Sequence, residues 1–314
     1  MISDPSSKIK TVTVLCPIYN EAENIIDFYK AFTEITSVIE GVNFKYLFAD
    51  NNSSDDSVLI VQGLCDVKND VGLIKYSKNF GYMKSIYTGF INSDSDACVI
   101  FDCDLQDPPR LLFDFIEKWR EGYKVIYGMR GTRIERKSLG FLRSSFRKFE
   151  IFIKGYKVEI ESGAWFLDRK VIDELRRLRF DPYLPGLISR LGFKTIGIPY
   201  HREARKNGTP KGNTFLYLAY ARDGLVSGTI TPLRLTALFG ALLSTISFIA
   251  MFYFLAAKLF LGAPFASGVA ALSIIVLFGF GINFIFLGIL GEYIGRIYLE
   301  RENSESAIIE MRYP

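Results

Sequence analysis

Hydrophobic residues follow two different patterns along this chain of 314 residues. Through the first two hundred residues, short apolar, β-branched runs alternate with helix-length amphipathic segments, which is typical of a mainly parallel sheet with covering helices. Pro108 and Pro109 suit the start of a helix, where a missing N–H costs nothing. The predicted strands are 11–16, 45–49, 72–76, 97–101, 124–127, 164–167 and 194–199, and the predicted helices are 22–39, 57–67, 83–91 and 109–120.

The second pattern is a long apolar region over 235–291, in which Lys258 is the only charged residue. The stretches on either side of this lysine are each long enough for the ~20 residues that cross a hydrocarbon core. Glycine and proline residues favour a tight hairpin over 258–268. We therefore predict two transmembrane helices, 235–257 and 269–290. A buried pair of core helices is the alternative.

Flanking cations predict the orientation of these spans. Arg222 and Arg234 precede the first span and Arg296 and Arg301 follow the second, whereas the hairpin carries one lysine. Cytoplasmic loops carry an excess of Lys and Arg, so both ends of the hairpin are expected in the cytoplasm. The first ten residues lack the apolar core of a signal peptide, and the N-terminal domain should therefore stay on the same side.

These patterns divide the chain into an α/β domain over 1–215, a juxtamembrane segment over 216–234, the two spans within 235–290 and a cytoplasmic tail over 291–314. Within the first domain, the segment 130–157 has nine Lys or Arg residues against two acidic ones, interleaved with apolar residues. This composition predicts a basic amphipathic helix at the membrane surface. An ordinary helix with a solvated basic face is the alternative, and nucleic-acid binding is the weaker use of the same composition.

The net charge favours neither a nucleic acid nor a membrane as a partner, because 38 basic residues are nearly balanced by 34 acidic ones. The cysteines lie in or near strand-like runs without CxxC spacing, which argues against a disulfide framework or a zinc site. We interpret them as reduced thiols in the cytosol. They are Cys16, Cys65, Cys98 and Cys103.

Two aspartates, Asp102 and Asp104, directly follow the predicted strand 97–101. Ligands of open parallel sheets bind beyond the carboxyl ends of the strands. Two carboxylates at such a strand end can hold a hard divalent cation, which would bridge the two phosphates of a nucleotide-sugar. An isolated Asp-x-Asp is common in proteins, so a metal-binding function needs support from the residues at the other strand ends.

Distinctive segments follow each of the first four strands. They are Pro17-Ile18-Tyr19-Asn20-Glu21, Asp50-Asn51-Asn52-Ser53-Ser54-Asp55, Ser77-Lys78-Asn79-Phe80-Gly81 and Asp102-Cys103-Asp104-Leu105-Gln106-Asp107-Pro108-Pro109. They resemble the P-x-Y-N-E, D-D-G-S-x-D, S-R-N-x-G and D-A-D-L-Q-H-P-P loops of family 2 glycosyltransferases of GT-A fold, of the polyprenyl-phosphate hexosyltransferase type. Two later segments are also similar to that family: Arg202, Arg205, Gly208 and Lys211 to R-x-x-R-x-x-G-x-S-K, and Gly291 to Arg296 to G-E-Y-x-G-R.

The resemblance implies a GT-A (Rossmann-like) catalytic domain followed by the membrane hairpin. It also implies Mg²⁺ or Mn²⁺ on Asp102 and Asp104. The implied donor is UDP-glucose, with GDP-mannose second, and the implied acceptor is polyprenyl (undecaprenyl) phosphate. The implied reaction inverts the anomeric carbon and takes place at a bacterial inner membrane. Its product, a polyprenyl-phosphate sugar, would serve in the modification of cell-envelope glycans. The resemblance also implies a homo-oligomer. The implied nucleotide-sugar contacts are Pro17, Tyr19, Glu21, Asp50, Asn79, Lys84, Asp102, Cys103, Asp104 and Gln106, and the implied catalytic residues are Asp104, Glu161, Arg202, Arg205 and Lys211.

Several positions depart from the family pattern. Asn51-Asn52 replaces Asp-Gly, Lys78 replaces Arg, and Pro210 replaces Ser. Gly163 stands where the family has an Asp that is often proposed as the catalytic base, and Glu159 and Glu161 are the nearby carboxylates. A phosphate monoester has a second pKa near ~6 and is already largely a dianion at neutral pH. General-base help would then be minor, so we predict that Glu161 orients the acceptor or the sugar without being an essential base.

Two other functions remain open at this point. A processive polysaccharide synthase would carry a Q-x-x-R-W motif, which this chain lacks, and more spans. A non-catalytic membrane partner that binds a nucleotide is the second alternative, because the usual base is absent.

Overall fold

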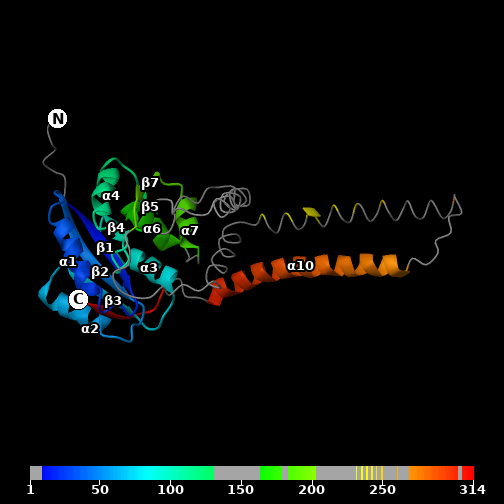
Figure 1. Ribbon diagram of the computed structural model, residues 1–314, viewed down its shortest axis with the longest axis horizontal. Coiled ribbons are helices and arrows are strands. Elements are labelled where there is room, and N and C mark those ends of the chain that lie inside the picture. Colours follow the sequence, from blue (N-terminus) through cyan, green and yellow to red (C-terminus); the bar gives the residue numbers. More distant parts are fainter. Residues whose placement is uncertain are drawn as a thin grey trace. The chain divides into compact units, whose positions relative to one another are not determined.

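The computed structural model describes residues 9–130, 163–178, 183–202, 269–302 and 306–314, together with single positions between 231 and 260. The chain divides into two compact units. Unit 1 comprises Met1–Ser227 and Ser304–Pro314, and unit 2 comprises Gly228–Asn303. Figure 1 shows the sheet and helices of unit 1 and the long helix α10 (Val269–Glu302) of unit 2. The predicted basic segment 130–157 lies outside the described residues, except for Arg130.

Unit 1 is built on a sheet whose described strands have the order β7-β5-β6-β4-β1-β2-β3-β8. The pairs β4-β1, β1-β2, β2-β3 and β5-β7 are parallel, whereas β6 and β8 run antiparallel to their neighbours. The carboxyl ends of six strands and the amino ends of β6 and β8 therefore meet at one edge. The strands are β1 Lys10–Ile18, β2 Val42–Asp50, β3 Val71–Tyr76, β4 Ala97–Ile100, β5 Val125–Arg130, β6 Trp165–Asp168, β7 Thr195–Tyr200 and β8 Ile309–Tyr313.

Helices cover both faces of this sheet, because each presents an apolar stripe to it. In α1 the buried residues Ile25, Phe28, Tyr29 and Phe32 recur with helical spacing. One core contains α1 (Ile25–Thr36), α2 (Ser57–Val67) and α4 (Leu111–Arg120), and the other contains α3 (Tyr82–Ile91), α6 (Arg169–Arg177) and α7 (Leu184–Arg190). The predicted α/β class is confirmed, and the predicted strands and helices are present with shifted ends. Helices α6 and α7 were not predicted.

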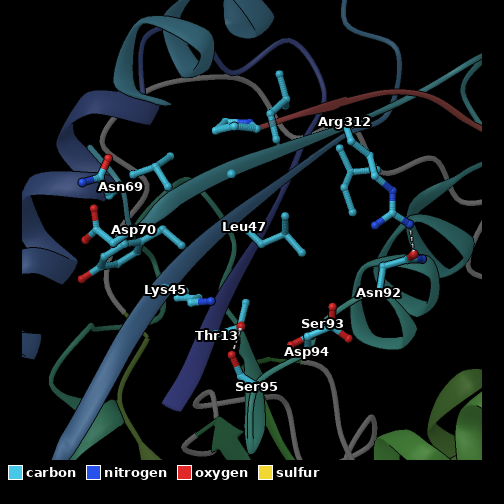
Figure 2. Close-up of a pocket in the computed structure, with 16 residues that line it drawn as sticks. Thr13, Lys45, Leu47, Asn69, Asp70, Asn92, Ser93, Asp94, Ser95 and Arg312 are labelled. Carbon is cyan, nitrogen blue, oxygen red and sulfur yellow. Dashed lines mark hydrogen bonds between the residues drawn. The ribbon is translucent and has the colours of Figure 1, made fainter. Parts of the chain in front are cut away.

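A cavity of about 250 Å³ lies away from the strand ends that carry the predicted site. Thr13, Lys45 and Leu47 of β1 and β2 line it, together with Asp94 and Arg312 (Figure 2). Its polar groups are partly satisfied within the protein, because the hydroxyls of Thr13 and Ser95 hydrogen-bond at 2.7 Å and Arg312 donates to Asn92. None of the residues predicted for the nucleotide-sugar site lines this cavity.

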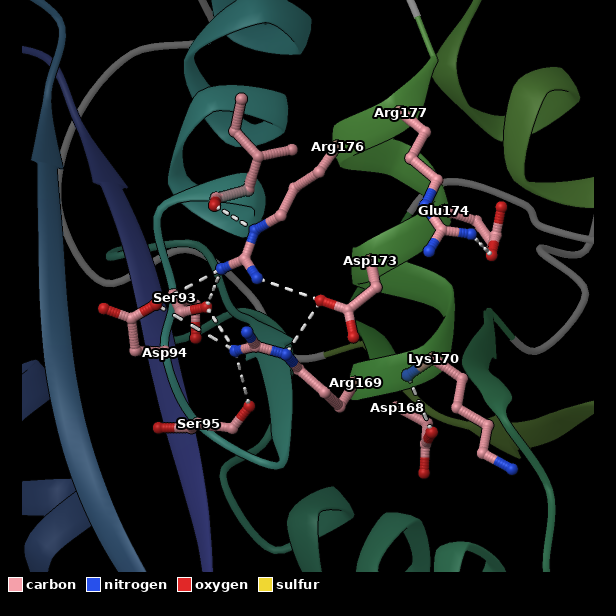
Figure 3. Close-up of polar contacts among 11 residues, drawn as sticks. Ser93, Asp94, Ser95, Asp168, Arg169, Lys170, Asp173, Glu174, Arg176 and Arg177 are labelled. Carbon is pink, nitrogen blue, oxygen red and sulfur yellow. Dashed lines mark hydrogen bonds and ion pairs between the residues drawn. The ribbon is translucent and has the colours of Figure 1, made fainter.

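Two arginines of α6 fix the turn that leads into β4 (Figure 3). Arg176 donates from Nε to the carbonyl of Ile91 at 2.7 Å and from Nη2 to that of Ser93 at 2.6 Å, and Arg169 also reaches the Ser93 carbonyl at 3.2 Å. Asp173 pairs with both guanidinium groups at 2.9 Å. This network therefore fixes the turn before β4, the strand that leads toward Asp102.

The C-terminal segment corrects part of the predicted division of the chain. The sequence indicated a cytoplasmic tail over 291–314, but α10 continues to Glu302, and Ile309–Tyr313 forms β8 on the edge of the sheet beside β3. The segment is also bound to unit 1 by hydrogen bonds from Ala307 N–H to Thr88 Oγ1 at 2.8 Å and from Ser77 N–H to the Ile308 carbonyl at 3.0 Å. The end of the chain therefore belongs to the α/β unit.

Unit 2 contains the region predicted to cross the membrane. The ring of Phe239, in the first predicted span, makes an edge-on contact with Phe286 of α10, with centroids 6.3 Å apart. Within the ranges that the structure describes, no helix has the length and apolar character needed to cross a membrane. The two spans stay a prediction.

Candidate active site

The loops after β1 and β2 are joined by hydrogen bonds in both directions. Asn20 N–H donates to Ser53 Oγ at 2.9 Å, and Ser54 N–H donates to Asn20 Oδ1 at 2.8 Å. Asn20 has a φ of +55° and Asn52 one of +64°, a left-handed conformation that asparagine tolerates better than most residues. Glu21 N–H adds a bond to Ser57 Oγ at 3.0 Å. The backbones of the two loops are thus held together by these bonds.

Asp50 ends β2 with its carboxylate fully buried. Burial raises the pKa of Asp50, against the opposing effect of hydrogen bonds from Ser53. The backbone N–H of Ser53 lies 3.2 and 3.1 Å from the two carboxylate oxygens. These contacts fix the Asp50 carboxylate at the carboxyl end of β2, the strand end at which the resemblance implies a contact with the base.

The loop after β3 is joined to both neighbouring loops. Asn51 Nδ2 donates to Asn79 Oδ1 at 2.8 Å, which connects it to the loop after β2. On the other side, the hydroxyl of Tyr82, the first residue of α3, donates to Asp102 Oδ1 at 2.8 Å. The predicted residue Lys84 lies further along the first turn of α3, where burial and the neighbouring Lys78 lower its pKa. Hydrogen bonds therefore connect the segment 79–82 to the loops after β2 and β4.

The loop after β4 contains three aspartates: Asp102, Asp104 and Asp107. Asp104 and Asp107 are buried, and Gln106 N–H donates to Asp104 Oδ1 at 3.2 Å. Burial, with the charges of Asp107 and Asp104, raises the pKa of Asp102 to about 6, although the hydrogen bond from Tyr82 opposes this. The side chain of Cys103 lies in the core and is 3% exposed. The contact with the nucleotide-sugar that was predicted for Cys103 would therefore have to come from its backbone.

This loop fits a divalent cation. Burial and the charges of Asp107 and Asp104 raise the pKa of Asp102, so a positive charge beside it would stabilise its ionised form, and oxygen is the ligand that Mg²⁺ and Mn²⁺ prefer. Among the described residues, no group of three or more His, Cys, Asp or Glu side chains is arranged to hold a metal ion. Asp102 and Asp104 would therefore hold the ion together with oxygen atoms that a ligand brings.

Arg202 is brought to the same loop by β7. Its Nε lies 3.4 Å from Asp107 Oδ1, and the hydroxyl of Tyr200 donates to the same oxygen. The sequence predicted Arg202 but missed Asp107 and Tyr200. The signal for Asp107 was present, since it is the third acidic residue of the Asp102–Asp107 segment. The other predicted residues of this side, Glu161, Arg205 and Lys211, lie outside the described residues.

Gly163, which stands in place of the family's proposed base, has a backbone conformation that favours glycine. Its φ is +140°, and the next residue, Ala164, is buried and accepts a hydrogen bond from Gly128 N–H at 2.9 Å. A side chain at this φ costs of order 1–3 kcal/mol. The backbone conformation at position 163 therefore favours the glycine that is present over an aspartate.

Comparison with known proteins gives full-length relatives. The family model for Glycosyl transferase family 2 matches residues 13–176. The uncharacterized glycosyltransferase YkcC of Bacillus subtilis is 34% identical over 306 residues, which cover 96% of this chain and 94% of that protein. The SfII prophage-derived bactoprenol glucosyl transferase of Shigella flexneri is 29% identical, with 95% of this chain and 97% of that protein covered. A prophage bactoprenol glucosyl transferase homolog of Escherichia coli is 28% identical, with 95% and 98% covered.

Proposed function

Because the chain belongs to glycosyl transferase family 2, we propose that it transfers glucose from UDP-glucose to a polyprenyl phosphate, with inversion at the anomeric carbon. The observation that carries this proposal is the connected set of loops after β1, β2, β3 and β4, which ends at the carboxylates of Asp102 and Asp104. The relatives named bactoprenol glucosyl transferases support a lipid carrier as the acceptor.

The donor would lie along these loops, with its base toward Asp50 and its diphosphate toward Asp102 and Asp104. Their backbone and amide groups are hydrogen-bonded to one another, so the loops are ordered relative to one another before the donor binds. A bound Mg²⁺ or Mn²⁺ would supply positive charge for the developing negative charge on the leaving diphosphate. Asp102 and Asp104 would hold it, and Tyr82 would orient Asp102 through its hydroxyl.

The acceptor would be positioned by cations rather than activated by a base. A phosphate monoester, with a second pKa near ~6, is already a nucleophile at neutral pH. Arg202, held beside Asp107, could place this phosphate opposite the leaving group, and Arg205 and Lys211 would add to this. Glu161 would orient the acceptor or the sugar. Gly163 fits this account, because no carboxylate is required at that position.

A membrane location is supported by both the sequence and the exposed residues of unit 2. The side chains of Leu272, Phe280 and Ile285 on α10 are each more than half exposed, although all are apolar. The chain leaves unit 1 after Ser227 and returns to it at Ser304, so any membrane crossings between them must be even in number. Two spans, as predicted from the sequence, satisfy this condition, and the flanking arginines support a cytoplasmic α/β unit. A homo-oligomer that assembles through the spans is part of the same proposal.

Cysteine labelling in right-side-out vesicles tests this topology. The four native cysteines are buried, so an introduced cysteine can be followed alone. Ser267→Cys, in the predicted hairpin, should react with a membrane-impermeant maleimide from outside. Ser37→Cys, on the exposed surface of unit 1, should react only after permeabilisation. Labelling of both positions from the same side would contradict the proposed hairpin.

Transfer itself is tested with purified protein, Mg²⁺, radiolabelled nucleotide-sugars and undecaprenyl phosphate. We expect label from UDP-glucose in the organic phase, and none when undecaprenol replaces its phosphate. Label from GDP-mannose alone would change the sugar but not the reaction class. If the protein binds a nucleotide yet transfers no sugar from any common donor, it is the non-catalytic partner and the proposal is wrong.

A further inference from the structure

The carboxamide of Asn51 joins the loops after β2 and β3 through two hydrogen bonds. Its Nδ2 donates to Asn79 Oδ1 at 2.8 Å, and its Oδ1 accepts from Phe80 N–H at 2.9 Å. Asn51 is 6% exposed, so its side chain cannot replace these partners with water. Its own backbone N–H donates to the Ile18 carbonyl at 2.9 Å, which also connects it to the end of β1.

Two backbone donors determine which way both amide groups face. Phe80 N–H needs an acceptor, which fixes the oxygen of Asn51 toward it, and Gly81 N–H donates to Asn79 Oδ1 at 2.8 Å. With Asn79 Oδ1 facing Asn51, the group opposite must be a donor. A backbone N–H cannot reverse its polarity, so neither amide can turn without losing a bond.

We infer that Asn51 is a positioning residue for the nucleotide-sugar, which sets the loop after β3 relative to Asp50 and to the metal-binding carboxylates. Gly81 has a φ of +83° and immediately precedes α3, whose first residue, Tyr82, donates to Asp102. A continuous series of contacts thus runs from Asn51 through residues 79–82 to Asp102. The inference rests on the proposed function, because it takes these loops as the donor site.

The same geometry explains why asparagine suits this chain at a position where the family pattern has aspartate. A carboxylate at position 51 could still accept from Phe80 N–H, but its second oxygen would face Asn79 Oδ1, and two acceptors repel. Asn79 could not turn to offer its own N–H, because Gly81 N–H needs the oxygen where it is. Asn51 and Asn79 therefore function as a pair.

The hydrogen bond from Asn51 Nδ2 to Asn79 Oδ1, called the bridge below, can be separated from the effect of charge by two single-group substitutions. Asn51→Asp and Asn79→Asp each add one negative charge at neighbouring positions. Asn51→Asp removes the donated hydrogen bond, whereas Asn79→Asp keeps an acceptor for both Asn51 Nδ2 and Gly81 N–H. The readout is amide hydrogen exchange of Phe80 and Gly81 in the full-length protein without nucleotide. We expect faster exchange by about tenfold in Asn51→Asp, and by less than about threefold in Asn79→Asp.

Steady-state kinetics then distinguish positioning of the donor from a purely structural role. We expect the donor KM of Asn51→Asp to rise about tenfold while the KM for polyprenyl phosphate stays within about twofold. Asn51→Ser, which loses the bridge without adding charge, should show the same split, and it replaces Asn51→Asp if that variant does not fold.

Two results would overturn the inference. Equal acceleration of exchange in Asn51→Asp and Asn79→Asp would assign the effect to charge, and equal rises in both KM values would assign it to general loosening of the fold. Failure of the proposed function is distinguishable from either result. In that case the wild-type protein would transfer no sugar from any common donor, while the exchange comparison would still report on the hydrogen bonds of Asn51.

Discussion

The two sides of the proposed active site are held in different ways. On the donor side, which we define as the loops after β1, β2, β3 and β4, each loop is hydrogen-bonded to the next. On the acceptor side, defined as Gly163 before β6 and Arg202 after β7, Arg202 is held next to Asp107 and the other residue has no side chain. The donor side is thus built from directional contacts. The acceptor side relies on charge, which suits an acceptor that is already ionised.

Removal of a metal-binding carboxylate should have the largest effect. Asp104→Asn should lower transfer by about a thousandfold, since stabilising the charge on the leaving group is a main source of rate enhancement in such reactions. The measurement is initial rates of lipid labelling. Asp114→Asn, an exposed position on α4, is the matched control and should keep wild-type rates. Full activity of Asp104→Asn, or of wild-type protein in EDTA, would show that transfer does not depend on a metal ion at this site.

Loss of the acceptor-side cation should come second. Arg202→Gln should lower kcat/KM for polyprenyl phosphate by about a hundredfold, while donor affinity stays within about twofold, because a charge-assisted contact to phosphate is worth ~1.5–3 kcal/mol. Exposed Arg177→Gln is the control. An equal loss of affinity for the nucleotide-sugar would instead place Arg202 on the donor side, and the two sides would then not differ in the way proposed.

An aspartate at position 163 tests whether the acceptor side lacks a base. Gly163→Asp should not increase transfer, and it should lower the free energy of unfolding by about 1–3 kcal/mol, because of the φ of +140°. Denaturant unfolding and transfer rates measure the two effects. A faster enzyme of unchanged stability would mean that the site accommodates and uses a carboxylate there.

The smallest effect is expected where the two sides share a scaffold. Asp168 of β6 accepts hydrogen bonds from Trp119 Nε1 at 2.7 Å and Lys124 Nζ at 2.8 Å. Although burial opposes ionisation, these bonds hold the pKa of Asp168 below its ordinary value. Asp168→Asn should cost about 1 kcal/mol of stability at neutral pH, with little change in transfer per folded molecule.

The pH dependence of this variant has a definite sign. A lowered folded-state pKa stabilises the protein above the unfolded-state pKa near ~4, and this contribution is lost as pH falls through the folded value. The difference in unfolding free energy between wild type and Asp168→Asn should therefore shrink as the pH falls below about 4. A difference that stays constant down to pH 2 would show that ionisation of Asp168 is not its source.

The sequence predicted the relative placement of the loops after β2, β3 and β4 better than it predicted the end of the chain. The carboxyl ends of adjacent parallel strands meet at one edge, so motifs at Asp50, Asn79 and Asp102 could be placed together without a structure. The strand β8 was missed because five alternating residues after a long apolar helix, Ile309 to Tyr313, resemble a polar tail when considered alone. The bridge between Asn51 and Asn79 could not be predicted, because it depends on which way two amide groups face.

The acceptor side was predicted only in part. Arg202 was identified by the resemblance, but its contact with Asp107 joins residues 95 positions apart, and no local pattern encodes such a contact. The glycine at 163 was recognised as a departure from the family, whereas its φ of +140° was visible only in the folded backbone. Contacts between distant segments and backbone conformation are therefore what the structure added.

In the proposed reaction, a sugar is transferred directly onto an ionised lipid phosphate. Mass spectrometry and NMR of the lipid product formed from UDP-glucose test this step. We expect one hexose and a single phosphate on the polyprenol, in the β-anomeric configuration, with UDP released. A product with two phosphates and released UMP, or an α-linked hexose, would show that the proposed reaction is wrong.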